Sequence, residues 1–160
     1  METFITTFSE KVIINQEVKL VIDGSQMGSK HVALVVSLVW DKRSIPLYWL
    51  VRKGEKGHFP KDMHLAVIEE AAKILQSILP PKTKVVLLGD GEFDSVDLQK
   101  LCREKLGWNY VFRTSCDAVM YDYDEQFKPE QTSVSSKSSF YFLHGISFSK
   151  QKYPDVNFLH

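Results

Sequence analysis

The sequence has few of the residues that define small secreted, fibrous or membrane proteins. Its 160 residues include two cysteines, Cys102 and Cys116, which are too few for a disulfide framework and do not form a Cys-x-x-Cys pair. We expect both to be reduced, partly buried thiols. Eight glycines and six prolines exclude the collagen-like and low-complexity classes. The longest apolar run, from Val32 to Trp40, is interrupted by Ser37 and is far shorter than the roughly 20 residues that span a bilayer.

The sequence also lacks a secretory segment and an excess of charge of either sign. The N-terminus has no basic region followed by an apolar stretch, so we expect a cytoplasmic protein with no membrane partner. The 20 basic and 20 acidic residues cancel, which argues against a dedicated basic nucleic-acid-binding module. The charge is nonetheless uneven. Residues 41–61 hold six basic side chains against two acidic ones, and residues 117–130 hold five acidic side chains against one basic one.

The composition that remains is ordinary for a globular protein, with 44% hydrophobic and 25% charged residues in a length that suits one domain. Apolar patterning predicts strands at 17–23, 31–40 and 45–52. Clusters of glycine, serine and charged residues predict a turn at 23–30 and a four-residue connection at 41–44. Three strands with short connections form an antiparallel meander.

Helices and strands are then expected to alternate. Apolar spacings of three and four predict a helix at 63–79, and an unbroken apolar centre predicts a buried strand at 84–90. A second helix is expected at 94–106 and another strand at 108–113. The caps expected for the second helix are Asp94 or Ser95 at its start and Gly107 at its end. Right-handed crossovers make the last two strands parallel, with the first strand as the natural neighbour of the fourth.

The predicted fold class is therefore α/β in the broad sense, an α+β mixed sheet in which a three-strand antiparallel meander precedes alternating helices and parallel strands. We expect a lead-in at 1–16, a core at 17–114 and a separate segment at 115–160. Residues up to 139 in that segment are mostly polar and are predicted to form a loop. Short, partly apolar runs at 140–143 and 155–160 are predicted strands.

The most specific chemical signal is a pair of aspartates that follow apolar strands, Asp23 in Val-Ile-Asp-Gly-Ser and Asp90 in Leu-Leu-Gly-Asp-Gly-Glu. If these strands are parallel neighbours, the two carboxylates lie side by side and repel unless a cation lies between them. Carboxylate oxygens suit Mg²⁺ or Mn²⁺, and the glycine after each aspartate leaves room for a bulky substrate backbone. The alternative is that Asp-Gly is a turn dipeptide which simply ends a strand.

Two further acids follow Asp90. Asp94 is explained by helix capping without any function, whereas Glu92 either faces solvent or supports the site from behind. The segment from Arg52 to Pro60 is basic and contains glycines, so its backbone N–H groups and cations are suited to phosphate. The alternative is a solvated loop, because no Gly-Lys-Ser/Thr opens the next helix. The candidate phosphate-contacting residues are Arg52, Lys53, Lys56, His58 and Lys61.

Other constellations are weaker. His58 and His64 do not predict zinc, because no third or fourth ligand has suitable spacing. The sequence has no Gly-x-Ser-x-Gly motif, and neither cysteine has an obvious histidine partner. Trp40, Tyr48 and Trp49 are expected in the core rather than as platforms that stack on bases.

Several motifs occur in one linked order between Leu20 and about Arg113. They are Val-Ile-Asp23-Gly-Ser, Pro46-Leu-Tyr-Trp-Leu, the Lys53–Pro60 loop, Leu-Leu-Gly-Asp90-Gly-Glu-Phe-Asp94 and Trp108-Asn-Tyr-Val-Phe-Arg-Thr114. In this order the segment resembles the catalytic core of DDE transposases of the bacterial insertion-sequence type. That family has an RNase H-like fold, with which the predicted order of elements is consistent.

The resemblance implies metal-dependent cleavage of DNA and strand transfer. Asp23 and Asp90 match the first and second acids of the catalytic triad, which would hold two Mg²⁺ (or Mn²⁺) ions about 3.5–4 Å apart. One ion would activate a water or a freed 3′-hydroxyl, and the other would stabilise the leaving oxygen. Glu92 and Asp94 match the end of the second motif and would support it. The implied partners are transposon ends and target DNA, in the cytoplasm at the nucleoid.

Two parts of the family pattern are missing. The third acid belongs to a Tyr-x2-Arg-x3-Glu-x6-Lys pattern that is not found here, and only 22 residues precede Asp23, where the family usually carries a DNA-binding region. We therefore expect a chain truncated at both ends, with 115–160 as the start of a β-rich insertion and with weak activity or none. The alternative is a non-catalytic remnant that binds DNA, or forms dimers, and interferes with intact transposase. A hydrolase or nucleotide-binding domain ranks last, because no phosphate loop or nucleophile motif is present.

Overall fold

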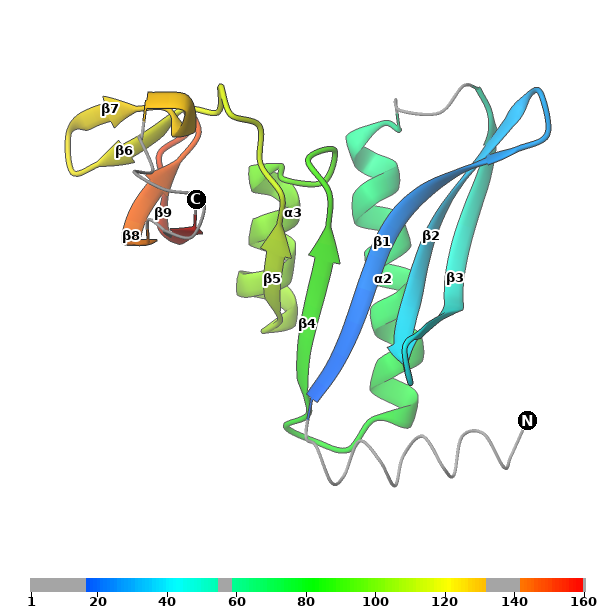
Figure 1. The fold of residues 1–160 in the computed structure, drawn as a ribbon. Coiled ribbons are helices and arrows are strands. Elements are labelled where there is room, and N and C mark those ends of the chain that lie inside the picture. The colour runs from blue at the N-terminus through cyan, green and yellow to red at the C-terminus, as the bar shows by residue number, and fades with distance from the viewer. Residues whose placement is uncertain (1–16, 55–58, 132–141, 160) are drawn as a thin grey trace. The chain divides into compact units, whose positions relative to one another are not determined.

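The computed structural model describes residues 17–54, 59–131 and 142–159 and divides into two compact units, Met1–Arg113 and Thr114–His160. The described elements of the first unit are the strands β1 (Glu17–Met27), β2 (His31–Trp40), β3 (Arg43–Lys53), β4 (Lys84–Gly89) and β5 (Asn109–Phe112), the helices α2 (Lys61–Ile78) and α3 (Val96–Lys100), and a π-helical turn at Leu101–Leu106 (Figure 1).

The five strands of the first unit form one mixed sheet in the order β3-β2-β1-β4-β5. The β1–β2 and β2–β3 pairs are antiparallel, and the β1–β4 and β4–β5 pairs are parallel. This confirms the mixed α+β fold class, the meander, and β1 as the neighbour of β4. A meander followed by two parallel strands on its first-strand side is the RNase H-like arrangement that the resemblance implied.

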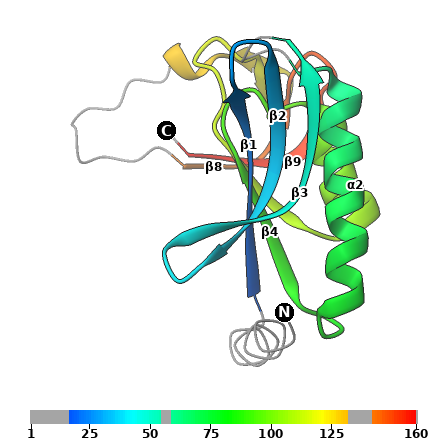
Figure 2. The ribbon, with the colours of Figure 1, turned by 90° about the vertical axis from the view of Figure 1, so that its right-hand side faces the viewer.

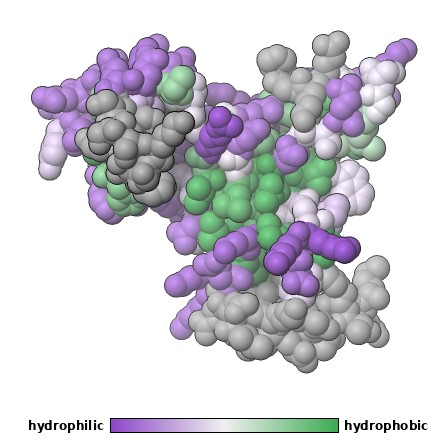
Figure 3. Space-filling model, viewed as in Figure 1, coloured by the Kyte–Doolittle hydropathy of each residue, from purple (hydrophilic) through white to green (hydrophobic). Residues whose placement is uncertain are grey.

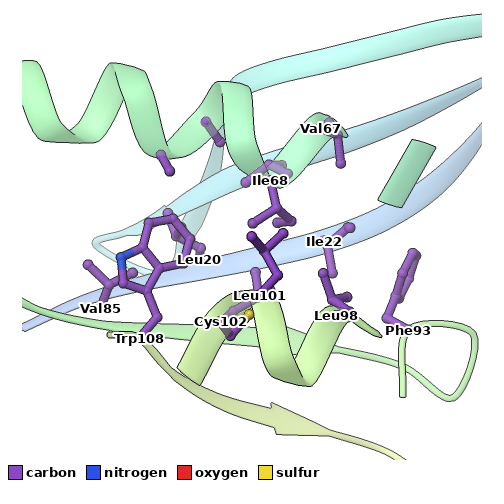
Figure 4. Packing of buried hydrophobic residues seen from close by; sticks show 14 of the residues in the cluster. Leu20, Ile22, Val67, Ile68, Val85, Phe93, Leu98, Leu101, Cys102 and Trp108 are labelled. Carbon is purple, nitrogen blue, oxygen red and sulfur yellow. The ribbon is translucent and has the colours of Figure 1, made fainter. Parts of the chain in front are cut away.

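Both helices lie on one side of the sheet (Figure 2). The α2 helix buries one stripe of side chains, of which Val67, Ile68 and Leu75 are at most 1% exposed. They meet Leu20 of β1 and Leu87 of β4, both fully buried, in one hydrophobic cluster with residues of α3 (Figure 4). The apolar residues whose spacing predicted the helix are therefore the ones that pack against the sheet. The helix begins at Lys61, two residues earlier than expected.

The β2–β3 connection is tighter than predicted. The β2 strand ends at Trp40 and β3 begins at Arg43, so only Asp41 and Lys42 form the turn. Their φ angles of 44° and 64° are those of a two-residue hairpin turn with the twist of the flanking strands. The sequence gives no glycine or asparagine to signal it. Pro46 lies on an edge strand, where the ladder shifts register between Val36 and Ser37.

Two other boundaries differ from the prediction. The β1 strand continues to Met27 rather than ending at Asp23, because the residues expected to form a turn pair with β2 as far as His31. The second helix begins after Ser95, whose hydroxyl accepts a hydrogen bond from the Leu98 N–H at 3.4 Å. Ser95 rather than Asp94 is therefore the N-cap, and the helix closes in a π-turn that ends at Gly107.

The second unit has more regular structure than the polar sequence suggested. It forms a four-stranded antiparallel sheet in the order β7-β6-β8-β9. Its elements are β6 (Met120–Asp122), β7 (Glu125–Phe127), a 3-10 turn (Pro129–Gln131), β8 (Phe142–Phe148) and β9 (Tyr153–Leu159). The β6–β7 hairpin lies where a loop was expected, because three-residue strands are too short to produce a visible alternation.

Its small core is formed by Met120, Ile146, Phe148, Tyr153 and Phe158. None of the helices in the described part of the chain has the length and hydrophobicity needed to cross a bilayer.

Candidate active site

The parallel register between β1 and β4 brings the two aspartates to equivalent positions. The ladder ends with Val21 opposite Leu88, and Asp23 and Asp90 each follow this pair by two residues along the chain. The β1 strand here leaves β4 and continues along β2, whereas β4 ends at Gly89. The carboxyl ends of parallel strands are where loops diverge and sites form. Both aspartates are exposed to solvent at this point.

Local hydrogen bonds orient each carboxylate. Asp23 Oδ1 accepts the Gly24 N–H at 2.8 Å, and Asp90 Oδ1 accepts the Glu92 N–H at 3.0 Å. The carbonyl oxygen of Asp90 also accepts the Phe93 N–H at 3.1 Å, which closes a tight turn immediately after β4. In each aspartate one carboxylate oxygen is engaged with the backbone, and Oδ2 is the atom available to a cation.

Glu92 joins this turn to the segment that precedes α2. Its Oε1 accepts the Phe59 N–H at 3.1 Å, and its side chain is 25% exposed. The Phe59 ring lies against Gly24, where a Cβ atom would come within 2.5 Å of the ring. The open space beside Gly24 therefore belongs to Phe59 and not to a substrate backbone, which corrects the prediction for this glycine. Glu92 thus links the turn after β4 to Phe59, a residue that the sequence analysis did not single out.

His64, a buried residue of α2, lies close to Glu92. It is 3% exposed, and its Nε2 is 4.0 Å from Glu92 Oε1. Neither ring nitrogen has a hydrogen-bond partner among the described residues. Burial lowers the pKa of His64 below 6.5, and the charges of Glu92 and Asp62 only partly oppose this shift. The imidazole packs on Phe93 with ring centroids 4.9 Å apart.

The remaining predicted residues are dispersed. Asp94 is partly buried, and its backbone oxygen accepts the Gln99 side-chain amide at 2.9 Å. Lys53 ends β3 and Lys61 begins α2, and both are exposed. The guanidinium of Arg52 lies over Gly54, on the same strand end as Lys53. Lys56 and His58 lie outside the described residues.

The sheet face opposite the helices is apolar. Val111, Leu88 and Val21 are register partners on it, and Val35 pairs with Trp49 on the same face as Asp23. Trp49 is 56% exposed, which corrects its expected place in the core, whereas Trp40 and Tyr48 pack against the core. Figure 3 shows this apolar face over the middle of the sheet.

The two cysteines behave differently. Cys102 is buried and burial raises its pKa to about 12, whereas Cys116 is exposed and not partly buried as expected. Both are free thiols.

The donor set fits a hard divalent cation only in part. Two aspartates with available carboxylate oxygens are ligands that Mg²⁺ and Mn²⁺ prefer. Within residues 17–54, 59–131 and 142–159, however, no group of three or more His, Cys, Asp or Glu side chains gathers as a metal site. The described residues therefore offer Asp23 and Asp90 only as two candidate ligands for such a cation.

Comparison with known proteins gives a limited result. No protein-family model matches the chain, and no curated protein matches it. Among solved structures, the chain is similar to the Mos1 transposase catalytic domain crystallised with raltegravir and manganese, with a TM-score of 0.44 and 16% identity over 68% of this chain and 55% of that one. The Mos1 strand transfer complex gives a TM-score of 0.42 and 11% identity over 71% and 39% of the two chains.

An exopolyphosphatase from Cytophaga hutchinsonii gives a TM-score of 0.30 and 17% identity over 59% of this chain and 33% of that one. The chain thus spans about half the length of the first Mos1 structure and less of the other two. At identities of 11–17% these similarities concern the fold and say nothing of what this chain binds or cleaves.

Proposed function

We propose that this chain is the RNase H-like core of a DDE transposase of the bacterial insertion-sequence type, and that Asp23 and Asp90 together bind a divalent cation at which DNA phosphodiester bonds are cut and joined. The observation that supports the proposal is the parallel register of β1 with β4, because Asp23 and Asp90 each follow the last register pair by two residues. The finer assignment to insertion sequences rests on the order of the motifs around these aspartates.

Each residue has a separate part in this proposal. Asp23 and Asp90 offer Oδ2 atoms whose orientation is set by the backbone N–H bonds at Oδ1. A bound Mg²⁺ or Mn²⁺ would supply Lewis-acid stabilisation of the charge that develops on phosphate oxygens. The exposed Lys53 and Lys61 would contact DNA phosphates, together with Arg52, Lys56 and His58.

Only weak activity, or none, is expected from the 160 residues. The sequence has no Tyr-x2-Arg-x3-Glu-x6-Lys pattern to provide a third carboxylate, and two ligands hold a cation less firmly than three. We propose that residues 115–160 begin a β-rich insertion, which their antiparallel sheet supports. Sequencing the DNA on both sides of the reading frame tests this directly. A following segment with that pattern would supply the missing acid.

Metal binding provides a test that does not depend on activity. Mn²⁺ titration followed by electron paramagnetic resonance is expected to show weak binding that Asp23→Asn and Asp90→Asn each reduce at least tenfold. Asp97→Asn is the matched control, because Asp97 is exposed on α3 and the change removes the same charge. Equal affinity in the wild type and Asp90→Asn would refute the proposal. Mn²⁺-dependent nicking of plasmid that is lost in Asp90→Asn would instead show that the expected inactivity is wrong.

A second candidate is a non-catalytic remnant that binds DNA or pairs with intact transposase. The apolar sheet face favours pairing, because exposed apolar patches mark interaction surfaces and Trp49, Val51 and Val111 are 56%, 48% and 61% exposed. Analytical ultracentrifugation is expected to show self-association that Trp49→Glu weakens. A monomer at high concentration would remove the support for pairing. DNA binding through lysines would fall steeply with salt, and insensitivity to salt would count against it.

A further inference from the structure

The pair His64 and Glu92 has properties that ordinary core packing does not explain. His64 occupies a buried position on the face of α2, where an apolar side chain of similar size would avoid the cost of burying two polar nitrogens. Neither nitrogen has a hydrogen-bond partner among the described residues. Buried polar groups without partners are uncommon and call for a specific explanation. A carboxylate oxygen, Glu92 Oε1, lies 4.0 Å from Nε2.

That same oxygen holds the backbone of Phe59. The Phe59 N–H to Oε1 distance is 3.1 Å, and this bond joins residues 33 positions apart in the sequence. Phe59 is only 7% exposed, and its ring fills the space over Gly24, the residue next to Asp23. The Glu92 backbone N–H in turn holds the Asp90 carboxylate at 3.0 Å. Glu92 is therefore linked to both aspartates. Its backbone N–H donates to the Asp90 carboxylate, and its side chain holds Phe59, whose ring lies against Gly24 next to Asp23.

The separation of His64 and Glu92 is longer than a direct hydrogen bond of about 2.7–3.2 Å but short enough for electrostatic attraction. The imidazole Nε2 is buried, and the Glu92 side chain beside it is 25% exposed. Asp62 and Lys61 are the other charged groups that act on His64, with opposite effects. The imidazole packs against Phe93, which is fully buried and follows Glu92 directly, so the ring and the turn are fixed together.

We propose that His64 and Glu92 are positioning residues that fix Phe59, and with it Lys61 at the start of α2, against Gly24 of β1, the residue that follows Asp23. This inference rests on the proposed function for its consequence, which is the correct placement of Lys61 toward DNA phosphates. The contact itself does not depend on catalysis. Phe59 bridges Glu92 and Gly24, because its N–H donates to Glu92 Oε1 and its ring lies against Gly24.

The contact is tested by hydrogen exchange at the Phe59 amide. Glu92→Ala removes the acceptor and is expected to speed exchange about tenfold or more, whereas Glu92→Gln keeps an oxygen acceptor and stays close to the wild type. His64→Phe preserves the volume, loses the N–H, and is expected to speed exchange by a smaller factor. Unchanged exchange in Glu92→Ala would overturn the contact. Thermal unfolding of each variant shows whether the fold persists. If Glu92→Ala unfolds, His64→Phe carries the test, and unchanged Phe59 exchange in that variant would overturn the role of the pair.

The functional consequence is tested by binding to a duplex oligonucleotide at increasing KCl. Removing a carboxylate near an anionic ligand should by itself strengthen binding, and the control Glu104→Ala, at an exposed position in the π-helical turn, is expected to do this or nothing. Glu92→Ala is expected to weaken binding several-fold. The slope of log K against log salt should then be smaller by about 0.9 for each phosphate that the variant no longer neutralises. Glu92→Gln should restore binding.

The outcomes separate the two proposals. Stronger binding in Glu92→Ala, equal to that of Glu104→Ala, would mean that Glu92 is only a nearby charge and would overturn the positioning role. A wild-type chain that binds no DNA would refute the proposed function and the DNA consequence of the pair. Faster Phe59 exchange in Glu92→Ala would still establish the contact in that case.

Discussion

The two glycines that flank Asp90 should respond in opposite ways to the same substitution. A Cβ atom at Gly89 would lie 3.1 Å from Ile22 Cγ2, Phe93 Cβ and Phe112 Cδ1. Carbon atoms in favourable contact are about 3.5–4.0 Å apart, so all three neighbours would have to move in a packed interior. At Gly91 the nearest atom is the Arg113 carbonyl oxygen at 3.5 Å, which is an ordinary contact.

Gly89→Ala is therefore expected to destabilise the protein by about 1–3 kcal/mol, the usual cost of overpacking a core. The midpoint of thermal unfolding would fall by roughly 2–10 °C for a chain of this length. Gly91→Ala needs no such movement and reduces the freedom of the unfolded chain, so its effect should lie between neutral and a gain of about 1 kcal/mol. Urea denaturation with an unchanged m-value would show that the difference is one of stability.

A double-mutant cycle identifies the cause. Ile22→Ala removes Cγ2, so Gly89→Ala should cost less in that background, with a coupling of about 0.5 kcal/mol or more. Additive effects would mean that the crowding at Ile22 is not the source of the destabilisation. Equal destabilisation by Gly89→Ala and Gly91→Ala would refute the reasoning as a whole, because backbone freedom would then outweigh the packing around β4.

Three other outcomes are expected. Iodoacetamide at pH 8 should label Cys116 and spare Cys102 in the folded protein, because burial raises the pKa of Cys102 to about 12 and keeps its thiol protonated; two adducts by mass spectrometry would contradict this. The pKa of His64 is lowered by burial, so the unfolded chain binds the proton more readily and the stability that this shift contributes is complete above pH 6.5 and lost as pH falls below it. Thermal unfolding should thus show a decrease in midpoint on acidification that is smaller in His64→Phe, and identical pH profiles would exclude the effect. Lys42→Gly should raise stability by up to about 1 kcal/mol, because φ is 64° in the hairpin turn, and a lower unfolding midpoint would argue against that turn.

Much of the fold follows from local patterns. The strand at 31–40 is predicted with its observed bounds, because its valine-rich sequence is apolar on both faces of the strand and charged or small residues flank it. The α2 helix and the β4 strand are predicted to within two residues, since a stripe at helical spacing and a short apolar run have few alternatives. The parallel pairing of β1 with β4 follows from the handedness of crossovers rather than from any one motif.

The features that the sequence predicted wrongly depend on contacts with residues far away in the sequence. Asp23 lies within a strand because β2 pairs with the residues after it, and Gly24 accommodates Phe59, which belongs to the distant segment before α2. No local pattern contains either contact. Trp49 stands in a continuous apolar run, as a core residue would, but its register places it on the sheet face opposite the helices, where it is 56% exposed.

Local patterns are enough to predict the order of the elements in the first unit, the α+β class and the two candidate aspartates, because spacing, capping and turn chemistry act over a few residues. The face of the sheet that the helices cover is a property of the folded chain, since the alternation along a strand defines two faces without choosing between them. The tertiary structure also decided that Glu92 holds Phe59 and lies close to a buried His64. That arrangement requires the turn after β4 and the start of α2 to come together in the folded chain. Burial then favours specific contacts among their polar side chains, because water cannot serve as the partner.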